Sequence, residues 1–136
     1  MSFRTLSFLL FACLILASCE EDKLEQYEGI WDGSYAGDEV GTMTIRIKED
    51  GISQGVAYPE EAEEGQSFVF TGSVNEDGEI TMTANVFGRV ATYNAFVTET
   101  ELTGSWIADG GNFQGTWSAT KRVNEDRFPY NTLLNP

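Results

Sequence analysis

The residue types in this sequence restrict the chemistry that the protein could catalyse. The sequence contains no histidine and two cysteines, Cys13 and Cys19. Ser-His-Asp and Cys-His catalysis, histidine-based zinc sites and histidine pH switches are therefore excluded. Carboxylates are abundant, but glycoside hydrolysis needs a facing pair about 5–10 Å apart in a cleft. The acidic residues fall in predicted turns, in the N-terminal segment or on outward faces, so we expect no enzyme activity.

An acidic loop is the next candidate site. Residues 59–66 read PEEAEEGQ and place four carboxylates within five residues. Such a loop could contact a basic partner, or bind calcium through several oxygens. It lacks the D-x-[DN]-x-[DN]-G spacing of a calcium loop, and a run of charge is usually solvated. We therefore predict an exposed loop, no metal site and no cofactor.

A short leader precedes Cys19. Residues 6–17 carry no charge and follow a single positive charge at Arg4. Twelve residues are too few to span a bilayer, which takes about 20, but they suit the apolar region of a signal peptide. Small residues, Ala17 and Ser18, leave the bond before Cys19 accessible to a peptidase. One alternative is an ordinary secretory leader cut nearby, with Cys19 left as a free thiol.

Leu16-Ala17-Ser18-Cys19 resembles the lipobox of bacterial lipoproteins. The resemblance implies cleavage before Cys19, a diacylglycerol thioether, an N-acyl chain such as palmitate, and anchoring to the outer membrane. The following Glu20-Glu21-Asp22-Lys23 is similar to the acidic signal that sends lipoproteins of the Bacteroidetes group to the cell surface. The alternative is an acidic spacer on a protein that faces the periplasm.

Net charge narrows the set of partners. Removing residues 1–18 takes away one charged side chain, Arg4, and moves the net charge from −14 to −15. A surface this acidic repels phosphate backbones, so we expect no nucleic-acid binding. We expect membrane contact through the lipid alone, while an envelope protein with a basic surface stays an allowed partner. With Cys19 lipidated, the mature chain has no cysteine left for a disulfide.

Short alternating segments predict an all-β domain. Residues 1–18 form the leader, 19–28 an acidic tether, 29–121 the β domain and 122–136 a C-terminal tail. Within the domain, apolar and polar residues alternate, as in Met43, Ile45 and Ile47, without a sustained helical period. The predicted strands are 29–35, 41–48, 52–58, 67–75, 79–86, 90–98, 101–108 and 112–121.

Short turns join these strands. Segments 49–51 and 75–78 each end in glycine, as expected for a type I turn followed by a left-handed residue. Consecutive strands with short connections pair antiparallel, and an even number lets the first strand meet the last. We therefore predict an eight-stranded up-and-down meander in a closed or nearly closed barrel, with a two-sheet β-sandwich as the alternative.

A repeated motif supports the barrel. Residues 102–106 (LTGSW) and 113–117 (FQGTW) share an apolar-x-Gly-x-Trp pattern. A glycine on the same face as large residues lets a strand coil and leaves room for a neighbouring ring. These strands look like those of lipocalin- and avidin-like barrels. The resemblance implies either a filled interior or a cavity for one small ligand.

Two functional hypotheses follow. Seven aromatic residues fall on inward faces, and four of them are the candidate ligand-lining residues: Trp31, Tyr35, Trp106 and Trp117 (the others are Phe68, Phe70 and Phe113). Because most inward positions are large, we expect a filled interior. The first hypothesis is a lipid-anchored, non-enzymatic interaction or accessory module of the cell envelope. The alternative is a binder of a small hydrophobic ligand at the barrel mouth.

Overall fold

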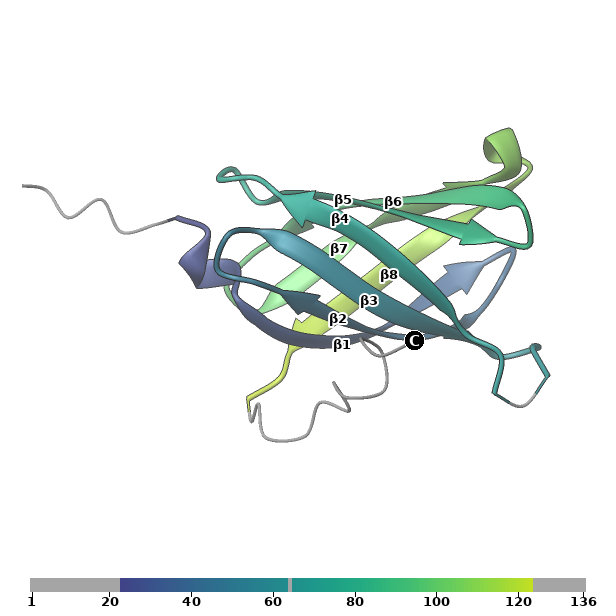
Figure 1. Cartoon of the computed structure of the whole chain (residues 1–136), viewed down its shortest axis with the longest axis horizontal. Coiled ribbons are helices and arrows are strands. Elements are labelled where there is room, and N and C mark those ends of the chain that lie inside the picture. Colours follow the sequence, from purple (N-terminus) through teal and green to yellow (C-terminus); the bar gives the residue numbers. More distant parts are fainter. Residues whose placement is uncertain (1–22, 64, 124–136) are drawn as a thin grey trace, which may run out of the picture.

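Eight antiparallel strands form a closed barrel in this computed structural model, which describes residues 23–63 and 65–123 (Figure 1). The prediction of a closed eight-stranded meander is confirmed, rather than the sandwich. Cys19, the leader and the tail beyond residue 123 lie outside the described residues. The strands are β1 Gly29–Gly37, β2 Gly41–Ile47, β3 Ile52–Pro59, β4 Phe68–Val74, β5 Glu79–Val86, β6 Arg89–Val97, β7 Glu101–Ala108 and β8 Phe113–Lys121.

The barrel closes between the first and last strands. Tyr35 of β1 lies opposite Gly41 of β2 on one side and opposite Trp117 of β8 on the other. The predicted alternation holds, since Met43 and Ile45 are buried inward positions while Thr42 and Thr44 face outward. Closure leaves no unpaired edge that could pair with another chain.

Glycine turns set the register at one end of the barrel. Gly51 and Gly78 have φ values of 83° and 81°, the left-handed conformation that glycine adopts without a steric penalty. Their amides donate to the carbonyls of Lys48 and Asn75, three residues earlier. The predicted turn type is confirmed at both places.

A short 3-10 helix covers this same end. Helix η1, Glu25–Tyr27, lies within the segment that the sequence assigned to the tether, yet Tyr27 is only 6% exposed. Trp31 donates its indole N–H to the carbonyl of Tyr27, and Leu24 packs against the core. We call this the closed end of the barrel. No helix in the described part of the chain is long and apolar enough to cross a membrane.

The Gly-Trp repeat works as a reciprocal pair between β7 and β8. Trp106 lies opposite Gly115, and Trp117 lies opposite Gly104. The indole of Trp106 reaches the carbonyl of Ala36 on β1 at 3.1 Å. The indole of Trp117 reaches the carbonyl of Asn94 on β6 at 3.2 Å. Each indole ring thus crosses the neighbouring strand at its glycine and donates a hydrogen bond to a carbonyl of the strand after it. The glycine permits this because it has no side chain to block the ring.

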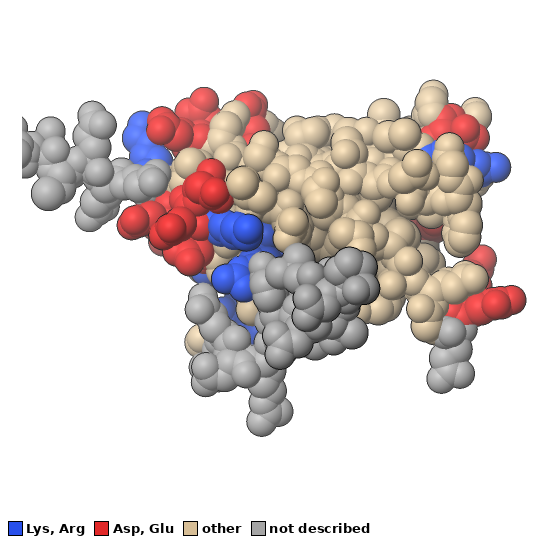
Figure 2. Space-filling model, in the orientation of Figure 1, with Lys and Arg blue, Asp and Glu red and all other residues tan. Residues whose placement is uncertain are grey.

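Charged side chains gather at the two ends of the barrel. In the view of Figure 2, acidic residues cluster around η1 at one end and around the loops at the other, and the wall between them is almost free of charge. The outward positions of the central strands are mainly threonine, serine and asparagine, such as Thr81, Thr83 and Asn94 on β5 and β6. The net negative charge is therefore concentrated where the loops are.

Candidate functional site: the barrel mouth

The end of the barrel opposite η1 is hollow. The described residues of four connections surround it: 38–40, 60–63 with 65–67, 87–88, and the short helix η2, Asp109–Gly111. We call this end the mouth (right-hand end of Figure 1). A mouth hollow of about 820 Å³ lies under the first three connections. An inner hollow of about 320 Å³ adjoins it, and the two share Glu39, Phe68, Val86 and Phe87.

Small inward residues create this space. Ala84, Ala91 and Ala108 lie directly opposite one another across β5, β6 and β7. On the other side of the barrel, Gly37 lines the mouth hollow. In the closed half, comparable positions hold Trp31, Ile45, Ile80 and Leu102, which fill the space. The expectation of a filled interior is therefore confirmed for the closed half and wrong for the mouth half.

Aromatic rings line the hollow and continue into the core. Phe68, Tyr93, Trp106 and Phe113 line the inner hollow, and Phe68 also lines the mouth hollow. Tyr35 packs against this group, with its ring 6.4 Å from Phe68 and edge-on to Trp106 at 6.3 Å. Of the four candidate residues from the sequence, Trp106 lines the hollow and Tyr35 borders it.

The other two candidates belong to the packed core. Trp31 is fully buried in the closed half and donates a hydrogen bond to the carbonyl of Tyr27 in η1. Trp117 lies below Tyr93, edge-on to its ring at 5.9 Å, and its indole N–H is shared between the carbonyls of Asn94 and Ser105. Their assignment as ligand-lining residues is therefore corrected. Alternation in the sequence indicates whether a side chain points into the barrel, but not how far along the barrel axis the side chain lies.

An unusual phenylalanine stands at the rim. Phe87 and Gly88 form the two-residue turn between β5 and β6, and Phe87 has a φ of 52°. This conformation costs a bulky residue about 1–2 kcal/mol, and asparagine is far commoner there. Phe87 is nevertheless 86% exposed and lines both hollows. A strained, exposed aromatic ring contributes little to the fold, and such strain is concentrated at functional sites.

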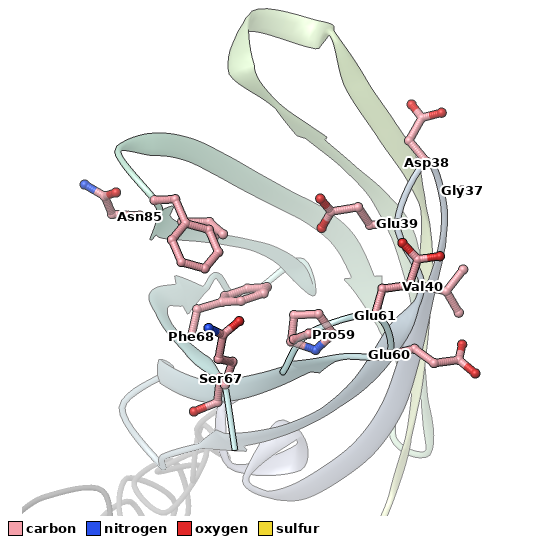
Figure 3. Close-up of a pocket in the computed structure, with 14 residues that line it drawn as sticks. Gly37, Asp38, Glu39, Val40, Pro59, Glu60, Glu61, Ser67, Phe68 and Asn85 are labelled. Atoms are coloured by element: carbon pink, nitrogen blue, oxygen red, sulfur yellow. The ribbon is translucent and has the colours of Figure 1, made fainter. Parts of the chain in front are cut away.

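The charges at the mouth are mostly negative. Glu39 points into the hollow, whereas Asp38 and Glu60 point away from it (Figure 3). Asp38 accepts a hydrogen bond from the backbone N–H of Gln114 at 2.9 Å, which ties the β1–β2 loop to β8. Arg89 is the one cation among the lining residues of the described chain. It lies over the ring of Phe113 at 5.3 Å and 4.0 Å from the carboxylate of Asp109.

The two tyrosines near the hollow are held in their neutral form. Burial raises the pKa of Tyr35 to about 12, and the negative charge of Glu39 adds to that effect. Burial also raises the pKa of Tyr93, with smaller contributions from Tyr35 and Glu39. The hydroxyl of Tyr35 is buried and has no hydrogen-bond partner among the described atoms.

Within residues 23–63 and 65–123, no group of three acidic, histidine or cysteine side chains is arranged to hold a metal ion. Of the acidic loop, Glu60 and Glu61 line the outer edge of the mouth hollow.

Sequence reasoning missed three residues that shape the mouth: Glu39, Phe87 and Arg89. Phe87 had a usable signal, because a Phe-Gly pair between alternating strands marks a two-residue turn in which the first residue must be left-handed. Glu39 had none, since the direction of a side chain in a loop depends on how the loop folds over the barrel.

Comparisons with known proteins give the fold alone. The sequence matches no protein-family model and no curated protein. Among solved structures, the chain is similar to a redesigned beta barrel, with a TM-score of 0.51 and 10% identity, over 76% of this chain and 96% of that one. At this identity the likeness extends to the barrel architecture and not to any ligand.

Proposed function

We propose that this protein is a lipid-anchored, non-enzymatic binding protein of the bacterial cell envelope that holds one small ligand in the inner hollow and the adjoining mouth hollow. The observation that carries the proposal is a hollow lined by Phe68, Trp106 and Phe113, beside an alanine row that leaves it unfilled. Of the two hypotheses from the sequence, the small-ligand binder thus has the stronger support.

The dimensions and lining of the hollow favour a small organic molecule. Ligand pockets usually measure about 300–1,000 Å³ and combine an apolar lining with a few polar groups. The mouth hollow has about 820 Å³ and the inner hollow about 320 Å³. Trp106 and Phe113 supply aromatic surface, while Glu39 and Arg89 supply polar groups. A ligand could insert an apolar part and leave a polar part at the rim.

The location belongs to the proposal and rests on the sequence. The lipobox-like residues 16–19 support a lipid on Cys19 and a place at the outer membrane, facing the periplasm or the cell surface. Two or more acyl chains would hold the protein stably on the membrane. A barrel anchored in this way could capture a molecule for delivery to another envelope protein.

An interaction module has some support from the outer wall. Phe96 on β6 is 64% exposed, and Val69 on β4 is half exposed. These side chains lie on separate strands with β5 between them, so they do not form one continuous apolar patch. Single exposed apolar residues are normal on protein surfaces and need no partner to explain them.

Binding of a neutral apolar fluorophore tests the proposal. Phenylnaphthylamine should bind the full-length lipoprotein in detergent with a saturable increase in fluorescence. Ala108→Phe should remove most of the binding, because the new ring would occupy the inner hollow that Ala108 lines. Ser105→Phe on the same strand is the matched control, since Ser105 is exposed on the outer wall.

Both variants must first give cooperative thermal melts. Saturable binding that survives in the control and disappears in Ala108→Phe supports the proposal. Absence of saturable binding in the folded wild type, or equal binding in the two variants, contradicts the ligand-binding proposal. The interaction module would then be the favoured hypothesis.

A further inference from the structure

We propose that the ligand of the mouth carries a positively charged amine on an aromatic or apolar body, and that Glu39 binds this amine. This inference rests on the proposed function, because it assigns a chemical class to the ligand of the same hollow. It follows from the placement of one carboxylate, one unsatisfied hydroxyl and a group of aromatic rings.

Glu39 is the acidic residue in position to bind a ligand's charge. It lines both hollows, and its carboxylate points inward in Figure 3. In the part of the chain that the structure describes, no hydrogen bond or ion pair engages it. Its neighbour Asp38, by contrast, is occupied by the backbone of Gln114. A carboxylate that faces an apolar hollow without a partner is suited to a cation from solution.

Arg89 is the one cation that lines the hollows in the described chain, and it already has partners. It lies over the face of Phe113 and 4.0 Å from the carboxylate of Asp109. The other charged lining residues are acidic: Asp38, Glu39, Glu60 and Glu61. Repulsion between like charges is strongest where low-dielectric walls exclude water. A fatty acid or another carboxylate would therefore bind less well than an amine of the same size.

Tyr35 supplies a second, independent indication of a polar ligand. Its side chain is 2% exposed, and its hydroxyl has no hydrogen-bond partner among the described residues. Leaving a buried polar group unsatisfied usually costs about 1–3 kcal/mol. The ring packs against Phe68 and Trp106, both of which line the inner hollow. Tyr35 itself lines neither hollow, and its hydroxyl lies beside Gly41, where β2 follows the loop that carries Glu39. A ligand polar atom that passes between the rings of Phe68 and Trp106 would satisfy it.

The aromatic lining suits the same class of ligand. A cation within about 6 Å of an aromatic face is attracted by the ring's quadrupole, most strongly over tryptophan. Trp106 and the exposed Phe87 line the inner hollow together with Glu39, whereas the ring of Phe113 already carries Arg89. The site thus offers ring faces for both the body and the charged group of an aromatic amine.

Three probes that share a ring system and differ in charge test the inference: naphthylethylamine, naphthylethanol and naphthylacetate. Calorimetric titration of the full-length lipoprotein in detergent should show the amine binding at least about tenfold more tightly than the carboxylate, a difference of about 1.4 kcal/mol. The preference should shrink at high salt, because Glu39 is reached by solvent.

Variants assign the preference to Glu39. Glu39→Gln should weaken amine binding about tenfold and leave the alcohol unchanged. Glu76→Gln is the matched control, since Glu76 is exposed in the β4–β5 turn at the closed end of the barrel, and it should change neither affinity. Tyr35→Phe should weaken binding of the amine and of the alcohol while keeping the thermal stability of the free protein.

The outcomes separate this inference from the proposed function. If the alcohol binds saturably but the carboxylate binds as well as the amine, or if Glu39→Gln leaves the amine affinity unchanged, the amine assignment is overturned while the binding function stands. If none of the three probes binds the folded protein, both fail.

Discussion

At the scale of single residues, two glycines allow neighbouring strands and tryptophan side chains to pack closely. A Cβ atom on Gly104 would overlap the carbonyl oxygen of Asn94, and one on Gly115 would overlap that of Ala36. These carbonyls accept the indole N–H bonds of Trp117 and Trp106. The two glycines thus allow both the close strand approach and the hydrogen bonds that lock the tryptophans.

The first prediction follows from this geometry. Gly104→Ala or Gly115→Ala should lower the free energy of unfolding by about 1–3 kcal/mol, since backbone must move to admit even one methyl group. Gly104→Val and Gly115→Val should cost more. Denaturant unfolding measures the loss.

Gly110→Ala is the control. Gly110 has a φ of 66° and open space around it, so its substitution carries only the conformational penalty, about 1 kcal/mol. Equal losses at Gly104, Gly115 and Gly110 would mean that close packing at the tryptophan pair is not what requires glycine.

Phe87 gives the second prediction at this scale. Asparagine is the preferred residue at the first position of this turn type, so Phe87→Asn should stabilise the free protein by up to about 1 kcal/mol. Because Phe87 lines the hollow, the same change should weaken binding of phenylnaphthylamine. Thermal melts and fluorescence titration measure the two effects separately.

Phe96→Asn is the matched control, since Phe96 is exposed on the outer wall and does not line the hollow. It should not weaken binding. A loss of stability in Phe87→Asn would show that the phenylalanine is retained for the fold rather than for a ligand.

At the scale of elements, the strands were predictable because two local signals agreed. Alternation fixed which residues of β2 and β5 face inward, and the Asp-Gly turns at Gly51 and Gly78 fixed where strands end. The mouth was harder to predict, because it depends on which residues share a level along the barrel axis. Ala84, Ala91 and Ala108 form one row only in the register of β5, β6 and β7, and sequence alternation does not give that register.

Helix η1 illustrates the same limit. Its single turn is too short to show a helical period, and it lies in a polar segment. Tyr27 becomes a core residue because it covers the closed end beside Trp31, a contact that depends on the finished barrel.

The seam between β1 and β8 carries an ion pair that predicts a pH dependence. Arg122, just after β8, donates from two guanidinium nitrogens to Asp32 of β1, at 2.7 and 2.6 Å. The hydrogen bond from Arg122 lowers the pKa of Asp32 below its ordinary value of 3.8, and a bond from Thr44 contributes further. A carboxylate with a lowered pKa in the fold stabilises it at neutral pH, and this contribution is lost as the pH falls below about 4.

Asp32→Asn should therefore destabilise the barrel at pH 7 by no more than about 1 kcal/mol, because the pair is partly exposed. The difference from wild type should shrink as the pH falls below about 4. Asp77→Asn, in an exposed turn, serves as the control for general charge effects. Denaturant midpoints at several pH values measure the difference, and a constant difference across the range would contradict the assigned role of the pair.

At the scale of the whole molecule, the anchor and the mouth are expected at opposite ends. The described chain begins at Lys23, beside η1 at the closed end. Three residues lie between Cys19 and Lys23. The four Cα-to-Cα steps of a fully extended chain reach at most about 14 Å. A lipid on Cys19 would therefore hold the closed end near the membrane and direct the mouth away from it.

The lipid itself is the fourth prediction. Labelled palmitate should enter the wild-type protein in cells, and Cys19→Ala should abolish labelling and leave an uncut or mislocalised product. The sequence has one other cysteine, Cys13, which would leave with the proposed leader, so Cys19 would be the one thiol to which a thioether could form. Equal labelling of the two proteins would contradict the lipoprotein assignment.

The orientation is the fifth prediction, and it uses the same absence of other cysteines. Glu60→Cys places a thiol at the mouth, and Glu76→Cys places one in the β4–β5 turn at the closed end. Each lipidated variant is labelled with a fluorophore and reconstituted into vesicles that carry a quencher on the lipid headgroup. The label at residue 76 should be quenched more strongly, because the short tether holds the closed end near the bilayer. Equal quenching, or stronger quenching at residue 60, would mean that the mouth does not point away from the membrane, and ligand would then have to enter from the membrane side.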